Sequence, residues 1–197
     1  MAQLHLPHMP HFEGWDTLAR SHMSVLKLFL LYALPLSVLP PVMLHYSGIA
    51  YGGNFILPIL NEMQLQVIGV VFFVTELVMT FLIAYIIQRL SELVDIKPAF
   101  EDAYKLAVVV PTPLWLASLF LFIPSFILNL TVVSAAMIIS GVLIYYGVPS
   151  ILKVEEKGHA TLLSGSILAA GLVGWAAMMY LTLITWSWVS SSMMLML

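Results

Sequence analysis

The chain has 197 residues, of which 61% are hydrophobic and only 9% are charged, and its formal net charge is −3. Soluble domains carry about 25% charged residues, so this composition excludes a water-soluble globule and predicts a membrane protein. The negative charge gives no indication of nucleic-acid binding. The absence of cysteine excludes disulfides, thiol catalysis and cysteine-based zinc sites.

Residues 1–24 are predicted to form a tail followed by a short amphipathic helix. His5, His8 and His11 recur every three residues, and in a polyproline II segment they would share one face. Three imidazoles suit zinc, nickel or copper, but a terminus has no packing to fix them, so metal affinity without a physiological role is the favoured interpretation. In the helix, Trp15 beside basic residues predicts an anchor at the membrane interface.

The rest of the chain, residues 25–197, is predicted to be a domain of five membrane spans. Crossing a hydrocarbon core of ~30 Å takes about 20 helical residues. The apolar runs cover residues 25–46, 63–90, 106–123, 126–148 and 161–189. Prolines at positions 35, 40, 41, 111 and 113 fall within the first and third runs. Each removes a backbone donor and predicts a kink, and a structural role is favoured over an interrupted-helix transport site.

A second short helix is predicted between the second and third runs, on the inner interface. Phe100 and Tyr104 are four residues apart, as are Glu101 and Lys105, so the segment has one apolar face and one paired face. Asp95 is the expected N-cap.

The basic residues indicate how the spans are oriented. All seven lie in the N-terminal segment, in every second connection or at the adjoining ends of the runs, and they are Arg20, Lys27, Arg89, Lys97, Lys105, Lys153 and Lys157. The positive-inside rule then puts the N-terminus in the cytoplasm and the C-terminus outside. The prediction is an all-α membrane protein, a bundle of five transmembrane helices with short interfacial amphipathic helices.

Glu76 is the only acidic or basic residue well inside a run. It lies about 20 Å from Arg89 and from Glu62 along a helix, and a charge at that depth costs about 2.5–3.5 kcal/mol on insertion scales. One interpretation is a carboxyl that binds a proton or a cation in a polar cavity. The favoured one is a neutral carboxyl hydrogen-bonded to a neighbouring helix, because no second intramembrane acid or base is present to build a relay.

Three stretches carry a resemblance to a known family. They are FEGWDTLARSHMSVLKLFLLYALPLSVLPPVMLHYSG, FEDAYKLAVVVPTPLWLASLF and SGVLIYYGVPSILKVEEKGHATLLSGSILAAGLV. With them the chain resembles a bacterial member of the Yip family of polytopic membrane proteins. The matching motif residues are Tyr104, Pro111, Tyr145, Gly147 and Pro149. Their favoured role is helix geometry, in which Pro149 ends the fourth span and Gly147 permits close packing.

The resemblance implies a non-enzymatic protein of a bacterial inner membrane that needs no cofactor. Eukaryotic Yip proteins bind prenylated Rab GTPases and one another, whereas a bacterial cell has no Rabs. The expected partners are therefore membrane lipids, further copies of the chain or other membrane proteins, and the expected action is through protein or lipid contacts. The alternative is a small transporter or channel with Glu76 as a mid-membrane carboxyl site. A third hypothesis is metal sensing or delivery by the N-terminal histidines.

Overall fold

The computed structural model describes residues 13–52 and 60–194, and every regular element among them is a helix. In chain order these are α1 (Glu13–Arg20), α2 (Val25–Leu28), the π-helix η1 (Phe29–Ala33), α3 (Leu34–Ser37), α4 (Leu39–Tyr51), α5 (Glu62–Glu92), α6 (Phe100–Val109), α7 (Thr112–Ala117), the 3₁₀-helix η2 (Ser118–Phe122), α8 (Phe126–Leu152) and α9 (Lys157–Met194).

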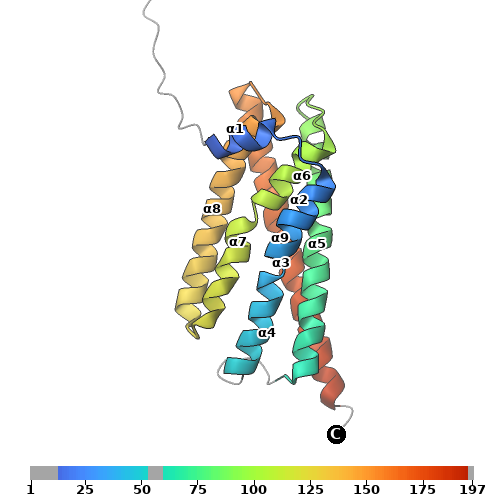
Figure 1. The fold of residues 1–197 in the computed structure, drawn as a ribbon, viewed down its shortest axis with the longest axis vertical. Helices are drawn as coiled ribbons and strands as arrows, with labels where there is room; N and C mark the ends of the chain where they lie inside the picture. Colours follow the sequence, from blue (N-terminus) through green and yellow to red (C-terminus); the bar gives the residue numbers. More distant parts are fainter. Residues whose placement is uncertain (1–12, 53–59, 195–197) are drawn as a thin grey trace, which may run out of the picture.

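Five spans are present, as predicted. The segments α2 to α4, α5, α6 to η2, α8 and α9 are each long and apolar enough to cross a membrane. They run alternately up and down, so that α1, the α5–α6 connection and the α8–α9 connection lie at one end of the bundle (Figure 1). The C-terminal end of α9 lies at the other. The predicted all-α membrane bundle is therefore confirmed.

Prolines interrupt the first and third spans, which confirms the predicted kinks. A proline at position i cannot donate to the carbonyl at i−4 and its ring clashes with it. The first span accordingly opens into the π-helix η1 just before Pro35, and Pro35, Pro40 and Pro41 fall at helix starts. In the third span α6 ends at Val109, and α7 begins beyond Pro111.

Pro149 does not end the fourth span, so that prediction is wrong. Helix α8 continues to Leu152, where Lys153 takes a left-handed conformation with φ 55°. The amides of Lys153 and Val154 both donate to the Pro149 carbonyl. The proline removes one backbone hydrogen bond, to the carbonyl of Tyr145 four residues earlier, and helix α8 tolerates this loss and closes on the carbonyl of Pro149.

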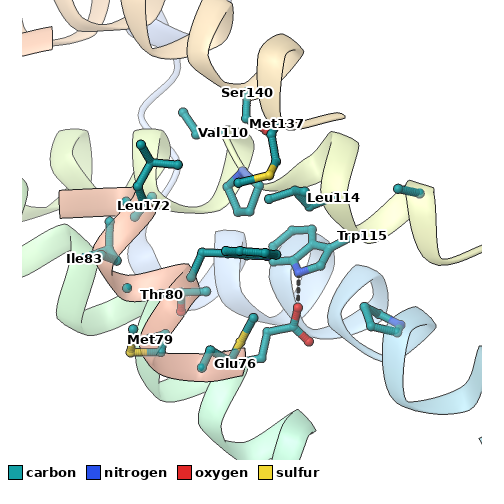
Figure 2. A pocket seen from close by; sticks show the side chains of 18 of the residues that line it. Glu76, Met79, Thr80, Ile83, Val110, Leu114, Trp115, Met137, Ser140 and Leu172 are labelled. Carbon is teal, nitrogen blue, oxygen red and sulfur yellow. Dashed lines mark hydrogen bonds between the residues drawn. The ribbon is translucent and has the colours of Figure 1, made fainter. Parts of the chain in front are cut away.

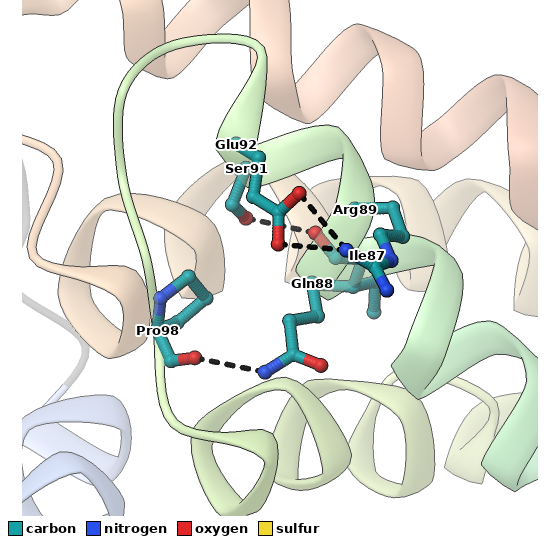
Figure 3. A network of polar contacts seen from close by, with 6 residues as sticks. All are labelled: Ile87, Gln88, Arg89, Ser91, Glu92 and Pro98. Atoms are coloured by element: carbon teal, nitrogen blue, oxygen red, sulfur yellow. Dashed lines mark hydrogen bonds and ion pairs between the residues drawn. The ribbon is translucent and has the colours of Figure 1, made fainter.

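The connection between α5 and α6 is held by polar contacts rather than by an Asp95 cap (Figure 3). Gln88 Nε2 donates to the Pro98 carbonyl over 3.1 Å and so ties α5 to the connection, whereas the exposed pair of Arg89 and Glu92, at 3.1 Å, lies within the last turn of α5. Asp95 itself adopts a left-handed φ of 59° in the turn, and α6 starts without a side-chain cap. The predicted capping role of Asp95 is therefore wrong.

The short helix predicted on the inner interface around Phe100 and Tyr104 is instead the first turn of the third span, packed into the core. Tyr104 is fully buried and lies against Phe100 and Phe81, with ring centroids 6.1 and 4.9 Å away. Lys105 is buried as well, and its Nζ pairs with Asp102 at 2.9 Å. The predicted partner, Glu101, is exposed.

Trp15 closes the α1 end of the bundle from inside, so the prediction of a membrane-interface anchor is wrong. Its side chain is 4% exposed and belongs to the core formed by α1, α2, η1, α5, α6, α7, α8 and α9. A Cβ added at Gly147 would lie 2.8 Å from the Trp15 ring and 2.8 Å from Leu106. The absence of a side chain at Gly147 is therefore what lets α1 dock on α8, as the packing interpretation of this motif residue expected.

Candidate functional site

Glu76 meets Trp115 in the middle of the bundle. The indole Nε1 of Trp115 in α7 donates to Oε1 of Glu76 in α5 over 2.5 Å (Figure 2). Glu76 is 6% exposed and Trp115 is 2% exposed. The favoured sequence interpretation, a carboxyl hydrogen-bonded to a neighbouring helix, agrees with this contact.

The break at Pro111 positions Trp115. The Pro111 carbonyl accepts from the amides of Leu114 and Trp115, at 2.9 and 3.1 Å, and so starts α7 in a new direction. The neighbouring Thr112 hydroxyl lies 2.8 Å from the Tyr32 hydroxyl, and this hydrogen bond connects the start of α7 to the first span. The family motif residue Pro111 thus places the indole one turn later, opposite Glu76.

A cavity of about 340 Å³ lies beside this pair. Its walls come mainly from α5, α7, α8 and α9, and Figure 2 shows Met79, Leu114, Met137 and Leu172 among the lining side chains. Of the described residues that line it, Glu76 alone has an ionisable side chain. The cavity is therefore an apolar space at membrane depth with one carboxyl group in its wall.

Two buried polar atoms in the cavity wall have no hydrogen-bond partner among the described residues. One is Oε2 of Glu76 and the other is Oγ of Ser140 on α8, a residue that is 7% exposed. Other hydroxyl residues of α8 donate to the carbonyl four residues earlier, and these are Thr131, Ser134 and Ser150. Buried polar groups in native proteins are nearly always paired, so these two atoms are exceptions at the edge of the cavity.

Only part of the predicted set of site residues comes together here. Pro111 lines the cavity with Glu76, whereas Tyr104 lies behind the wall, its hydroxyl 3.5 Å from that of Thr80. Tyr145 is 44% exposed on the outer surface of α8. Gly147 and Pro149 serve the docking of α1 and the end of α8, as described above.

The predicted metal ligands His5, His8 and His11 lie outside the described residues. Within residues 13–52 and 60–194, no group of three histidine, aspartate or glutamate side chains is placed to hold a metal ion.

Sequence reasoning missed Trp115 and Ser140. A signal for Trp115 was present, because it follows Pro111 by four residues, about one helical turn. Nothing in the sequence distinguished Ser140 from the other intramembrane hydroxyl residues, since its missing partner is a property of the packed bundle.

Comparison with known proteins identifies the family. No curated protein and no solved structure matches the chain. Residues 10–178 match the Yip1 domain, and this match covers most of the 197 residues, including the proline-broken third span that carries Trp115. The chain is therefore a multi-pass membrane protein that belongs to the Yip1-domain family.

Proposed function

We propose that this protein acts without catalysis, by holding a lipid molecule in the cavity between α5, α7, α8 and α9. The proposed setting is a bacterial inner membrane with the α1 end toward the cytoplasm, where membrane lipids, further copies of the chain or other membrane proteins are its partners. The observation that carries the proposal is the apolar cavity of about 340 Å³ at membrane depth. Binding sites for small molecules are typically about 300–1,000 Å³ and mostly apolar.

The lining of the cavity favours a lipid over an ion. A pathway for ions or protons inside a membrane is built from several polar or charged groups or from water-filled space. Here most neighbours of Glu76 are apolar, and Thr80 and Ser118 donate to the backbone carbonyls of Leu77 and Trp115. Asn129 donates to the carbonyls of Ile123 and Ser125, which leaves Ser140 as the one other polar lining residue without a partner among the described residues. A hydrocarbon chain matches such a lining without any loss of hydration.

We expect Gly171→Leu to expel the bound lipid. Gly171 lines the cavity, and a Cβ added there would meet no atom within 4 Å, so the new side chain can enter the cavity without displacing protein atoms. The measurement is native mass spectrometry of protein released from nanodiscs, which counts the lipid molecules that stay bound. The variant should lose most of the retained lipid.

Gly165→Leu is the matched control for this experiment. Gly165 lies on the same helix, is exposed, also has no atom within 4 Å of an added Cβ, and does not line the cavity. It should retain lipid as the wild type does. Equal retention by both variants and the wild type would contradict the proposed function.

The second candidate function is a small transporter or channel, and the unpartnered Oε2 of Glu76 is the observation that favours it. Proteoliposomes with an imposed pH or cation gradient test this candidate. From the apolar lining, we expect no proton or cation flux above that of empty liposomes, and no difference between the wild type and Glu76→Gln. A flux that Glu76→Gln abolishes would establish the transporter and displace the lipid-binding proposal.

A further inference from the structure

We propose that the lipid in the cavity is a neutral one whose hydroxyl group bonds to Oε2 of Glu76. This inference rests on the proposed function and adds the chemical class of the ligand. It follows from one buried atom without a partner, from the chemistry of the groups that could pair with it, and from its depth in the bundle.

The geometry leaves Oε2 of Glu76 for a ligand. Oε1 accepts from Trp115, while Oε2 is buried and has no partner among the described residues. Leaving a buried polar atom unpaired is unfavourable, and each such atom in a native fold calls for a partner. The nearby hydroxyl group of Thr80, one turn along α5, already donates to the Leu77 carbonyl. Glu76 itself lines the cavity, so a molecule held there can bond to Oε2 once the buried carboxyl group turns toward it.

A hydroxyl group fits Oε2 better than other polar groups do. It can donate to an ionised carboxylate and can accept from a protonated carboxyl, so it pairs with Glu76 in either state. A ketone or ester carbonyl can only accept. An ammonium group would bring a second ion into an apolar cavity, and the desolvation of a buried ion pair offsets much of its attraction.

The depth of Glu76 argues against a phospholipid headgroup at this position. Glu76 lies about 20 Å from the start of α5 at Glu62, and a charged headgroup pulled to that depth would be costly. A phospholipid whose headgroup stays at the membrane surface would present only its hydrocarbon tail and leave Oε2 unpaired. A long-chain alcohol carries one hydroxyl group and no charge, and so satisfies both requirements.

The experiment compares photoreactive probes of one chain length in nanodiscs that contain the full-length protein. The probes carry a chain diazirine and are hexadecanol, hexadecane, hexadecylamine and a phosphatidylcholine with a sixteen-carbon chain. After irradiation, peptide mass spectrometry measures the labelled fraction of the cavity-lining parts of α5, α7 and α9. We expect hexadecanol to label them about tenfold more than hexadecane, because one hydrogen bond to a buried group is worth about that factor.

Variants of Glu76 assign the preference to its carboxyl group. Glu76→Gln keeps an amide that can bond both to the indole and to a hydroxyl, so we expect it to keep a preference for hexadecanol. In Glu76→Leu, hexadecanol and hexadecane should label the cavity equally, and the labelling by hexadecane should persist. The comparison of probes within the wild type needs no variant, so the test stands even where Glu76→Leu folds poorly.

The outcomes separate this inference from the proposed function. Cavity labelling that Gly171→Leu removes, but that is equal for hexadecanol and hexadecane, would overturn the hydroxyl assignment and leave lipid binding intact. Stronger labelling by hexadecylamine or by the phosphatidylcholine would also overturn it, in favour of a charged headgroup. Absence of cavity labelling with every probe would overturn the proposed function itself.

Discussion

Trp115→Ala is expected to lower the free energy of unfolding by about 3–5 kcal/mol, the range measured for removing a large aromatic side chain from a core. The indole is 2% exposed and lines the cavity, so its loss enlarges the empty space beside Glu76. It also leaves both oxygens of Glu76 without a donor. Unfolding in mixed detergent micelles, followed by circular dichroism, measures the change.

Two further variants divide this effect between packing and the hydrogen bond. Trp115→Phe keeps an aromatic ring but has no Nε1 hydrogen. It should lower the free energy of unfolding by about 1–3 kcal/mol, the range for leaving a buried polar group unpaired. The smaller ring adds a further packing loss to this value. Combined with Glu76→Leu, which removes the acceptor, Trp115→Phe should cost less than it does alone. Fully additive effects of the two changes would contradict a direct contact between the indole and the carboxyl group.

Gly147→Leu is expected to undock α1 from the bundle. A Cβ at this position would lie 2.8 Å from the Trp15 ring and from Leu106, closer than real contacts allow, and the rest of the leucine would extend the clash. Overpacking a core typically costs about 1–3 kcal/mol, and displacing α1 also exposes Trp15. The readout is limited proteolysis, because trypsin should cleave after the exposed Arg20 faster once α1 is free.

The clash at Gly147 has both a matched control and a rescue. Gly165→Leu places the same side chain on α9 where an added Cβ meets no atom within 4 Å, so its proteolysis should match that of the wild type. Trp15→Ala combined with Gly147→Leu removes the ring that the leucine strikes, and should recover part of the lost stability. Cleavage after Arg20 at an unchanged rate in Gly147→Leu would contradict the docking of α1 on α8.

Features that depend on local sequence could be predicted. The number of spans follows from the length of each apolar run, and the kinks follow from proline chemistry at positions such as Pro35 and Pro111. Glu76 stood out because an acidic residue within an apolar run is rare. A hydrogen bond to a neighbouring helix was also the favoured interpretation, but the expected partner was a backbone carbonyl freed by a proline, whereas the partner in the structure is the Trp115 indole.

Features that depend on how helices face one another could not be predicted. The sequence assigned Trp15 to the membrane surface and the segment beginning at Phe100 to an exposed helix, whereas both pack into the core with Tyr104. In a soluble protein, the apolar stripe of a helix shows which side faces inward. The two long spans α5 and α9 are apolar around their whole circumference, so the pattern carries little information about their rotation.

The sequence by itself therefore determined the membrane class, the five spans, the positions of the kinks and the resemblance to the Yip family. The tertiary structure decided that Trp115 is the partner of Glu76, that Ser140 and Glu76 line one cavity, and that Gly147 receives Trp15. The physical reason is that hydropathy and proline geometry act within a single helix. The cavity and its polar atoms depend on how each of four helices is rotated about its own axis and on how far each is shifted along the bundle.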